Sequence, residues 1–175
     1  STPNPISPYG ASKLACEGYC MAYANSYNLN ITVLRFANVI GINSEHKKGV
    51  INQLLYSLKN QTTFNIFGDG SSSRDYISVR DLCMGIFLSV KHKNNNKFNL
   101  FHLSTGRETT IKELVNVFNN LVDKKIAVKY NKKRNGEVLK NFASSDLAKK
   151  ELKFLPKITI ENELKNILTE LKINK

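Results

Sequence analysis

The sequence predicts an α/β protein, and three observations support that class. Stretches with the periodicity of amphipathic helices alternate along the 175 residues with short runs rich in β-branched and aromatic residues. Hydrophobic residues make up 41% of the chain, which is typical of a folded protein and not of a disordered one. The sequence contains no internal repeat and no low-complexity linker. A chain of this length is long enough to form one domain with a buried core.

The first half of the chain predicts helices and strands in alternation. Prolines within residues 1–8 favour an extended loop there, and the Asn-Leu-Asn at 28–30 ends the helix that follows. The run ITVLRF is typical of a buried strand. The elements expected are a helix at 8–27, a strand at 31–36, a loop at 38–48, a helix at 50–59 and a strand at 63–67, closed by a turn at 68–70.

The second half continues the alternation and contains clear helix starts. Asp81 is a good N-cap for a helix that runs to residue 90. Another helix begins at Thr109 or Thr110 and runs to residue 121; if Thr110 is the cap, Glu113 stands where it completes a capping box. The other elements expected are strands at 98–103 and 126–130 and two helices headed by Ser145 and Thr159.

The net charge of +12 permits an acidic or nucleic-acid partner, but the pattern of charges does not favour nucleic acid. The lysines are spread along the chain and mixed with asparagine, as at 91–97 and 129–134, which is typical of solvated loops. The sequence has no helix-turn-helix, zinc-finger or RNA-binding aromatic signature. We therefore expect no nucleic-acid partner, and a phosphate-bearing substrate would use only one or two of these charges.

The three cysteines, Cys16, Cys20 and Cys83, are odd in number and widely scattered, which argues against a disulfide framework. They form no cluster at metal-ligand spacing, so we expect reduced thiols and no metal. No stretch approaches the apolar length of a membrane span, and the polar N-terminus does not look like a signal peptide. These observations predict a cytoplasmic protein with no membrane partner.

Tyr9 and Lys13 form a Tyr-x-x-x-Lys pair at the start of the first predicted helix. This spacing puts both side chains on one face of the helix, about one turn apart. A nearby ammonium favours the phenolate form of a tyrosine, so the pair suits a general acid/base acting on a hydroxyl group. The spacing alone also fits an ordinary surface pair. The chain has no Gly-x-Gly-x-x-Gly turn of the kind that receives a dinucleotide pyrophosphate.

Six blocks of the chain, in order, resemble the C-terminal part of the extended short-chain dehydrogenase/reductase family, within it the NAD-dependent nucleotide-sugar epimerases and dehydratases of the UDP-glucose 4-epimerase type. The IFGDGSSSRDYISVRD block is the most specific of them. The blocks are SPYGASK at 7–13, LRFANVIG at 34–41, GVI at 49–51, IFGDGSSSRDYISVRD at 66–81, HLSTG at 102–106, and RNGEV at 134–138 followed by ASSD at 143–146.

The resemblance implies the C-terminal part of a Rossmann-type NAD(P)-binding fold plus a small α/β substrate-binding domain. Residues 1–48 would end the Rossmann domain with the catalytic helix and the following strand. Residues 49–175 would be mainly the substrate domain, with 80–105 returning to the Rossmann sheet. The family's glycine-rich turn, its ribose-binding acidic residue and its catalytic Ser or Thr lie in an upstream half that these residues lack, so we expect this chain alone to be inactive.

The resemblance also implies a role for each matching residue. Tyr9 would be the acid/base that takes the proton from the sugar O4, and Lys13 would hold the nicotinamide ribose and lower the pKa of Tyr9. Phe36 would lie near the nicotinamide of NAD. Arginines would clamp the diphosphate, a suitable use of forked donors that are always charged. The substrate-binding residues would be Asn38, Gly49, Val50, Asn65, Phe67, Arg74, Arg134 and Glu137.

Several of these residues also have plain structural interpretations. Phe36 and Phe67 could belong to the core, Asn38 could be a turn residue, Arg74 could pair with Asp75, and Arg134 could be solvated.

The function predicted is that of an NAD-dependent nucleotide-sugar 4-epimerase of the UDP-glucose or UDP-N-acetylglucosamine type, homodimeric in the full-length protein. Its product would feed polysaccharide synthesis. A 4,6-dehydratase or 4-keto reductase is the alternative among enzymes. A non-catalytic module that binds nucleotide sugars is the alternative of another class.

Overall fold

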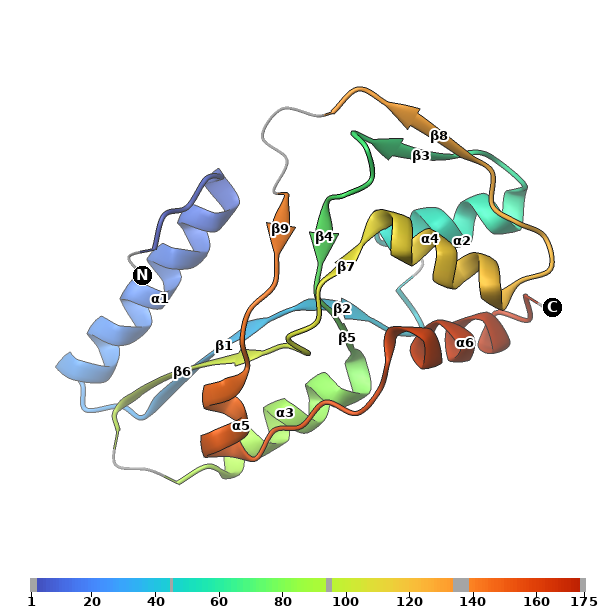
Figure 1. Ribbon diagram of the computed structural model, residues 1–175. Helices are drawn as coiled ribbons and strands as arrows, with labels where there is room; N and C mark the ends of the chain where they lie inside the picture. The colour runs from blue at the N-terminus through green and yellow to red at the C-terminus, as the bar shows by residue number, and fades with distance from the viewer. Residues whose placement is uncertain (1–2, 45, 94–95, 134–138, 174–175) are drawn as a thin grey trace.

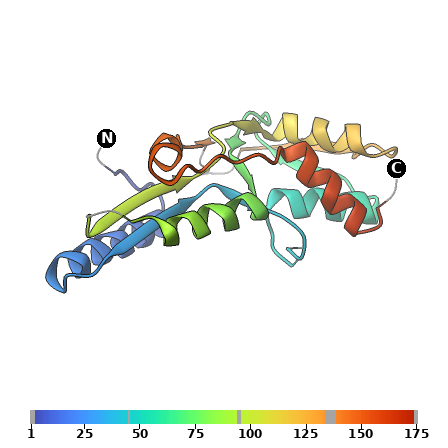
Figure 2. The same ribbon diagram turned by 90° about the horizontal axis from the view of Figure 1, so that it is seen from below.

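The computed structural model describes residues 3–44, 46–93, 96–133 and 139–173, and it has the predicted α/β character. Figure 1 shows two groups of elements joined by the short strands in the middle. Seen from below, the molecule is flat and elongated (Figure 2). The helices are α1 Pro8–Ser26, α2 Val50–Asn60, α3 Val79–Lys91, α4 Ile111–Leu121, α5 Asp146–Leu152 and α6 Ile160–Glu170.

The first group is built on two parallel strands, β1 Ile31–Phe36 and β6 Phe98–Leu103, paired in register along their whole length. Helices α3 and α5 pack against β6, and α1 lies along the other side of the pair (Figure 1). The core of this group contains Phe101, Leu103 and Phe154. Gly85 lets α3 approach closely, because a Cβ built there would stand 2.9 Å from side-chain atoms of both Leu103 and Phe154.

The second group contains helices α2, α4 and α6 around a larger core that includes Leu54, Leu114, Phe118 and Leu164. It also contains a parallel pair of strands, β3 Phe64–Phe67 and β8 Val128–Asn131. Helix α4 begins with the capping box expected from the sequence. The Thr110 hydroxyl accepts a hydrogen bond from the Glu113 N–H at 3.1 Å, and the Glu113 carboxylate accepts one from the Thr110 N–H at 2.7 Å.

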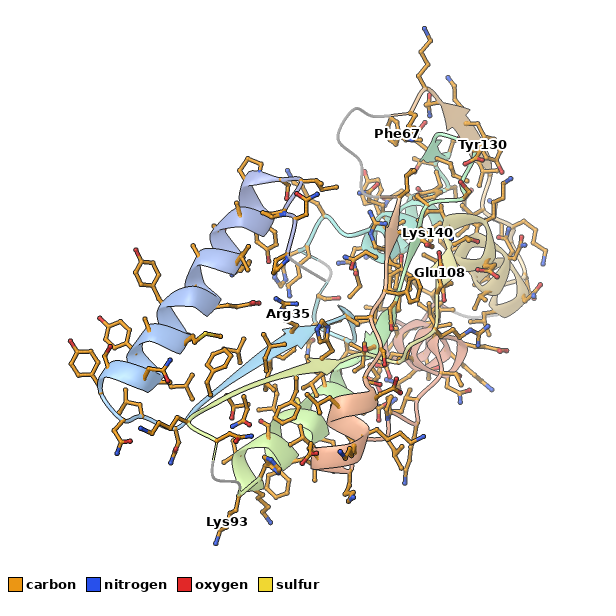
Figure 3. The ribbon with its side chains drawn as sticks, turned by 60° about the vertical axis from the view of Figure 1, so that its left-hand side comes forward. Arg35, Phe67, Lys93, Glu108, Tyr130 and Lys140 are labelled. Atoms are coloured by element: carbon orange, nitrogen blue, oxygen red, sulfur yellow. The ribbon has the colours of Figure 1, made fainter. Side chains whose placement is uncertain are left out.

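Short strands connect the two groups. β2 Asn38–Ile40 pairs in parallel with β5 Tyr76–Ser78. β4 Ser73–Arg74 lies between β7 Thr109–Thr110 and β9 Lys140–Asn141. Glu108 and Lys140 form an ion pair of 3.7 Å beside these strands (Figure 3). Strands β4 and β5, which lie within the most specific sequence block, are therefore at the centre of the molecule (Figure 1).

Three expectations about secondary structure need correction. The predicted loop at 38–48 begins with strand β2. Strands β4, β5, β7 and β9 were not expected either, because a strand of two or three residues is too short to show a periodicity in the sequence. The last strand begins at Val128 and not at 126, because Ile126 is buried in the core and its N–H binds the Asn119 side chain.

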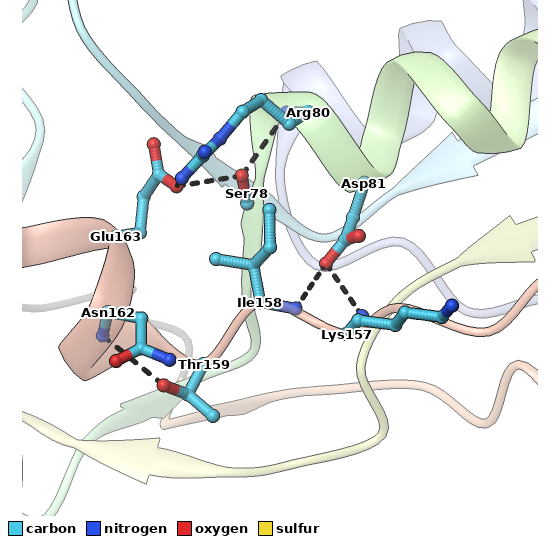
Figure 4. Close-up of polar contacts among 8 residues, drawn as sticks. All are labelled: Ser78, Arg80, Asp81, Lys157, Ile158, Thr159, Asn162 and Glu163. Carbon is cyan, nitrogen blue, oxygen red and sulfur yellow. Dashed lines mark hydrogen bonds and ion pairs between the residues drawn. The ribbon is translucent and has the colours of Figure 1, made fainter. Parts of the chain in front are cut away.

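The third correction concerns Asp81, which is not the N-cap of α3. Ser78 caps that helix, its hydroxyl accepting a hydrogen bond from the Arg80 N–H at 3.2 Å. Asp81 instead accepts hydrogen bonds from the backbone N–H groups of Lys157 and Ile158, at 2.9 and 2.8 Å (Figure 4). It therefore fastens the segment before α6 to α3, a contact between residues far apart in the sequence.

The start of α3 also makes a direct contact with α6. Glu163 is 1% exposed, and its carboxylate accepts hydrogen bonds from the Ser78 hydroxyl at 2.9 Å and from the Arg80 guanidinium at 2.8 Å (Figure 4). These two contacts satisfy a buried charge that would otherwise destabilise the fold. They join the two groups of elements at the carboxyl end of β5, one of the strands that line the site described next. The division of the chain into domains near residue 48 stays a prediction.

Candidate functional site

A cavity of about 230 Å³ lies where β2, β3, β4 and β5 meet the start of α2. It brings together five of the residues predicted to bind substrate, which come from four separate segments of the chain. They are Asn38, Val50, Asn65, Phe67 and Arg74. The remaining lining residues are Gln53, Phe64, Ile66, Ser72, Tyr76 and Ile111.

The pairing of short strands explains why distant residues meet here. Asn38 stands at the start of β2, directly opposite Tyr76 at the start of β5. Arg74 ends β4, where its guanidinium donates a hydrogen bond to the Ser73 carbonyl at 2.6 Å. Val50 is the first residue of α2. A helix start presents backbone N–H groups and the positive end of the helix dipole, which together favour an anionic ligand.

Asp75, between Arg74 and Tyr76 in the chain, is buried beside the main cavity and links the strands around it. Its carboxylate is 1% exposed and accepts three hydrogen bonds, from the Thr105 N–H at 3.1 Å, the Thr105 hydroxyl at 2.6 Å and the Gly106 N–H at 2.7 Å. Its backbone N–H donates to the Asn141 carbonyl, and its carbonyl accepts from Asn38. Asp75 therefore anchors the neighbouring turn, and within the described residues it forms no ion pair with Arg74.

Two further cavities adjoin the first. One of about 90 Å³ shares Asn38, Val50 and Tyr76 with it and also reaches Gly49, the N-cap of α2. The other, of about 600 Å³, shares Gln53, Phe64 and Asn65 and carries His46, Lys47 and Lys48 on its wall. The predicted residue Gly49 thus lies beside the main cavity, and Lys47 lines both adjoining cavities.

Tyr9 and Lys13 lie on α1, which begins at an N-cap serine: the Ser7 hydroxyl accepts a hydrogen bond from the Gly10 N–H at 3.0 Å. The Lys13 ammonium stands 5.4 Å from the centre of the Tyr9 ring, as the spacing predicts. Tyr9 is 72% exposed, and neither residue lines any of the cavities described here. The structure therefore pairs these two side chains but does not bring them to the main cavity.

One ion pair fixes α1 against β1. The Arg35 guanidinium donates two hydrogen bonds to the Glu17 carboxylate, at 2.7 and 2.6 Å, and Arg35 lies on the side of β1 that faces the helix (Figure 3). These bonds hold the pKa of Glu17 below, and the pKa of Arg35 above, their ordinary values. Ala24 is the one residue of α1 that is buried, so this pair is a principal anchor of the helix.

Phe36 lines a different cavity, of about 340 Å³, together with Arg35, Asp75, His102 and Phe142. Its side chain is half exposed at the end of β1, so the interpretation of Phe36 as a core residue is wrong. Burial, followed by the charge of Arg35, holds the pKa of His102 below its usual value. Phe67 likewise belongs to neither hydrophobic core and lines the main cavity, near Tyr130 at the end of the β3 and β8 pair (Figure 3).

Two of the predicted site residues, Arg134 and Glu137, are outside the described residues. Other site residues were not identified from the sequence. Tyr76, Gln53 and Ser72 line the cavity but were not predicted to do so. Tyr76 carried a readable signal, because it stands two residues after Arg74 in an extended segment, where alternate side chains point to the same side.

Comparison with known proteins places the chain in a family. The profile of the NAD dependent epimerase/dehydratase family matches residues 1–100. The chain is 30% identical over 169 residues to UDP-glucose 4-epimerase of Corynebacterium glutamicum, covering 89% of this chain and 51% of that protein. The chain therefore belongs to the NAD-dependent epimerase/dehydratase family. It spans about half the length of the curated relatives it matches.

Solved structures support the same assignment. UDP-glucose 4-epimerase of Thermotoga maritima, in a structure with UDP-glucose, matches with a TM-score of 0.88 and 32% identity, covering 98% of this chain and 55% of that one. A dTDP-glucose 4,6-dehydratase of Streptomyces venezuelae with NAD bound also has a TM-score of 0.88, at 25% identity, covering 99% of this chain and 54% of that one. The fold is thus the Rossmann-type fold of these enzymes, and NAD is the cofactor of the family.

No helix in the described part of the chain is long and apolar enough to span a membrane. Within the same residues, no group of three or more His, Cys, Asp or Glu side chains is placed to hold a metal ion.

Proposed function

We propose that the chain is the substrate-side part of a nucleotide-sugar 4-epimerase that acts on a UDP-sugar. The observation that carries this proposal is the cavity of about 230 Å³, in which five residues named from the sequence converge from four segments. A polar cavity beside a helix start, with an arginine on its wall, suits a diphosphate. The similarity to a UDP-glucose 4-epimerase along nearly the whole chain supports UDP as the nucleotide.

Within this proposal, each residue of the cavity has a chemical task. Arg74 binds the diphosphate, and the start of α2 at Gly49 and Val50 adds backbone donors. Asn65 binds the base through its backbone, while Phe67 stacks on it. Asn38 donates to the sugar or the phosphate next to it. Arg134 as a second diphosphate clamp and Glu137 as a ribose contact rest on the family resemblance.

The acid/base part of the proposal belongs to α1. Tyr9 takes the proton from the sugar O4 as C4 is oxidised and returns it to O4 when C4 is reduced from the opposite face. Lys13 stabilises the phenolate and binds the nicotinamide ribose. NAD, when bound, would supply the reversible hydride transfer at C4 on which epimerisation depends. The residues present fit the nicotinamide end, since Tyr9 and Lys13 stand together and Phe36 is half exposed at the carboxyl end of a parallel strand. They include no glycine-rich turn for the pyrophosphate.

The proposal predicts how this chain behaves alone. We expect it to bind UDP and UDP-glucose and to show neither NAD binding nor turnover. Isothermal titration calorimetry with UDP, UDP-glucose and NAD tests this. Heat of binding with UDP, absent with ATP, supports the proposal; equal binding of every nucleotide tested would mean that the cavity recognises phosphate alone.

Two specific alternatives remain separable by experiment. The dehydratase similarity favours a nucleotide-sugar 4,6-dehydratase as the second candidate, and NMR analysis of the products from UDP-glucose and dTDP-glucose distinguishes a C4 epimer from a 4-keto-6-deoxy sugar. A non-catalytic binding module is the candidate of another class. In the full-length protein, Tyr9→Phe abolishes turnover while keeping substrate affinity if the chain is an enzyme.

A homodimer formed through α1 is also part of the proposal. The helix is rich in apolar side chains, yet Tyr19, Met21, Tyr23 and Tyr27 are exposed along it. A helix that is apolar on several faces is normally covered by a partner. Sedimentation equilibrium of the full-length protein tests this, and replacing Tyr19 by Glu should shift the mass from two subunits to one.

A further inference from the structure

The hydroxyl group of Tyr76 is in an unusual position. The residue is 5% exposed, and among the described residues its hydroxyl is the buried side-chain polar group that has no hydrogen-bond partner. A buried hydroxyl without a partner destabilises the folded state. Native proteins rarely keep such a group unless a ligand or another molecule completes its bonding.

The position of Tyr76 indicates what kind of ligand would accept a hydrogen bond from its hydroxyl. The residue lines both the cavity of about 230 Å³ and the adjoining one of about 90 Å³, and Asn38 and Val50 are the other two residues the cavities share. Its ring packs in the larger core, so the position of the hydroxyl is fixed. A side chain fixed in this way beside a binding cavity can position a ligand that reaches its hydroxyl.

The charge around Tyr76 favours an anionic acceptor. Burial raises the pKa of Tyr76 to about 12, and the positive charge of Arg74 acts in the opposite direction. The hydroxyl therefore stays protonated near neutral pH and acts as a donor. An oxygen that Arg74 binds within this cavity would be negatively charged, and a hydrogen bond to such an oxygen is about twice as strong as one between neutral groups.

Building on the proposed function, we propose that Tyr76 is a substrate-positioning residue whose hydroxyl donates a hydrogen bond to a phosphate oxygen of the bound nucleotide sugar, beside Arg74. The ligand thereby supplies the partner that the fold does not. The strand pairing makes this geometry specific, because Tyr76 stands directly opposite Asn38 and two residues beyond Arg74. Three donors from three short strands then surround one diphosphate.

The test compares UDP with uridine, which has the base and ribose but no phosphate. UDP is titrated by calorimetry and uridine by NMR into the wild-type chain, into Tyr76→Phe and into the matched control Tyr19→Phe, whose hydroxyl is on the exposed surface of α1. We expect Tyr76→Phe to weaken UDP binding roughly 10- to 100-fold, as loss of a hydrogen bond to a charged group does. Uridine binding should change less than about twofold, and the control should match the wild type.

The melting temperature without ligand is the second readout. Because Tyr76→Phe removes a hydroxyl with no partner, it should leave this temperature unchanged or raise it, which a structural role would not produce. Unchanged UDP affinity in Tyr76→Phe overturns the inference, as does an equal loss for UDP and uridine or a lowered melting temperature with weaker binding of both. If the wild-type chain binds neither UDP nor uridine, the proposed function itself is wrong and the inference falls with it.

Discussion

Replacing Asp75 by Asn tests the idea that one buried carboxylate holds the strands around the cavity. The change keeps the size of the side chain but turns one acceptor oxygen into an NH₂ group. In the better orientation, the amide oxygen keeps the two bonds from Thr105 and the NH₂ group faces the Gly106 N–H. One hydrogen bond to a charged group is lost and a buried N–H loses its partner.

The expected loss of stability follows from the strength of the lost hydrogen bond. A hydrogen bond to a charged group contributes about 1.5–3 kcal/mol, so we expect Asp75→Asn to lower the free energy of unfolding by about 2 kcal/mol. For a chain of this size, that corresponds to a melting temperature lower by about 4–8 °C. Urea unfolding followed by circular dichroism measures the first quantity, and a thermal scan measures the second.

The control and the refutation use the same assay. Asp123→Asn changes an exposed aspartate in the same way and should alter the free energy of unfolding by less than about 0.5 kcal/mol. If Asp75→Asn is equally mild, the three hydrogen bonds do not stabilise the turn and the reasoning is wrong. Since the Asp75 backbone also binds Asn38 and Asn141, UDP affinity of the variant should fall as well.

Three further predictions concern packing, pH and binding. Gly85→Ala should destabilise the chain by about 1–3 kcal/mol because its Cβ meets fixed core atoms, whereas Gly18→Ala, with no atom within 4 Å, should be neutral or stabilising; urea unfolding compares the two. Glu17→Gln should reduce stability at pH 7, and the difference should disappear as the pH falls through the folded-state pKa of Glu17. That pKa is depressed by Arg35, so the contribution of Glu17 is present above the unfolded-state pKa and lost below the folded-state one; urea unfolding at a series of pH values measures it. Arg74→Lys should weaken UDP binding by about tenfold in calorimetry, because lysine lacks the forked geometry; an unchanged affinity would contradict its role.

Long elements were predictable from the sequence because their signals are local. The helix ending near 27, the strand at 31–36, the strand at 98–103 and the capping box at Thr110 all match, since periodicity and cap spacing act within one element. The predicted N-cap of α3 was wrong because the interaction that decides it is not local. Ser78 and Asp81 are both good caps, and the choice depends on the backbone of residues 157–158, which comes from the other end of the chain.

Site residues that lie in a family block could be named from the sequence. Features that depend only on packing between distant segments could not. Asn38, Asn65 and Arg74 line one cavity, although no periodicity in the sequence shows that their strands meet. The strands that bring them together are two to four residues long and depend on pairing with distant segments. The buried hydroxyl of Tyr76 was missed because its missing partner is visible only once the whole fold surrounds it.

The light anchoring of α1 has a consequence for how binding and chemistry respond to heat. The cavity is enclosed by segments packed into two cores. The helix that carries Tyr9 contributes to this chain one buried residue, a few partly buried ones and one ion pair. Segments with little buried surface open at lower free energy than the rest of a protein. On warming, α1 should therefore exchange its amide hydrogens first, and the acid/base pair should lose its position while the cavity still binds ligand.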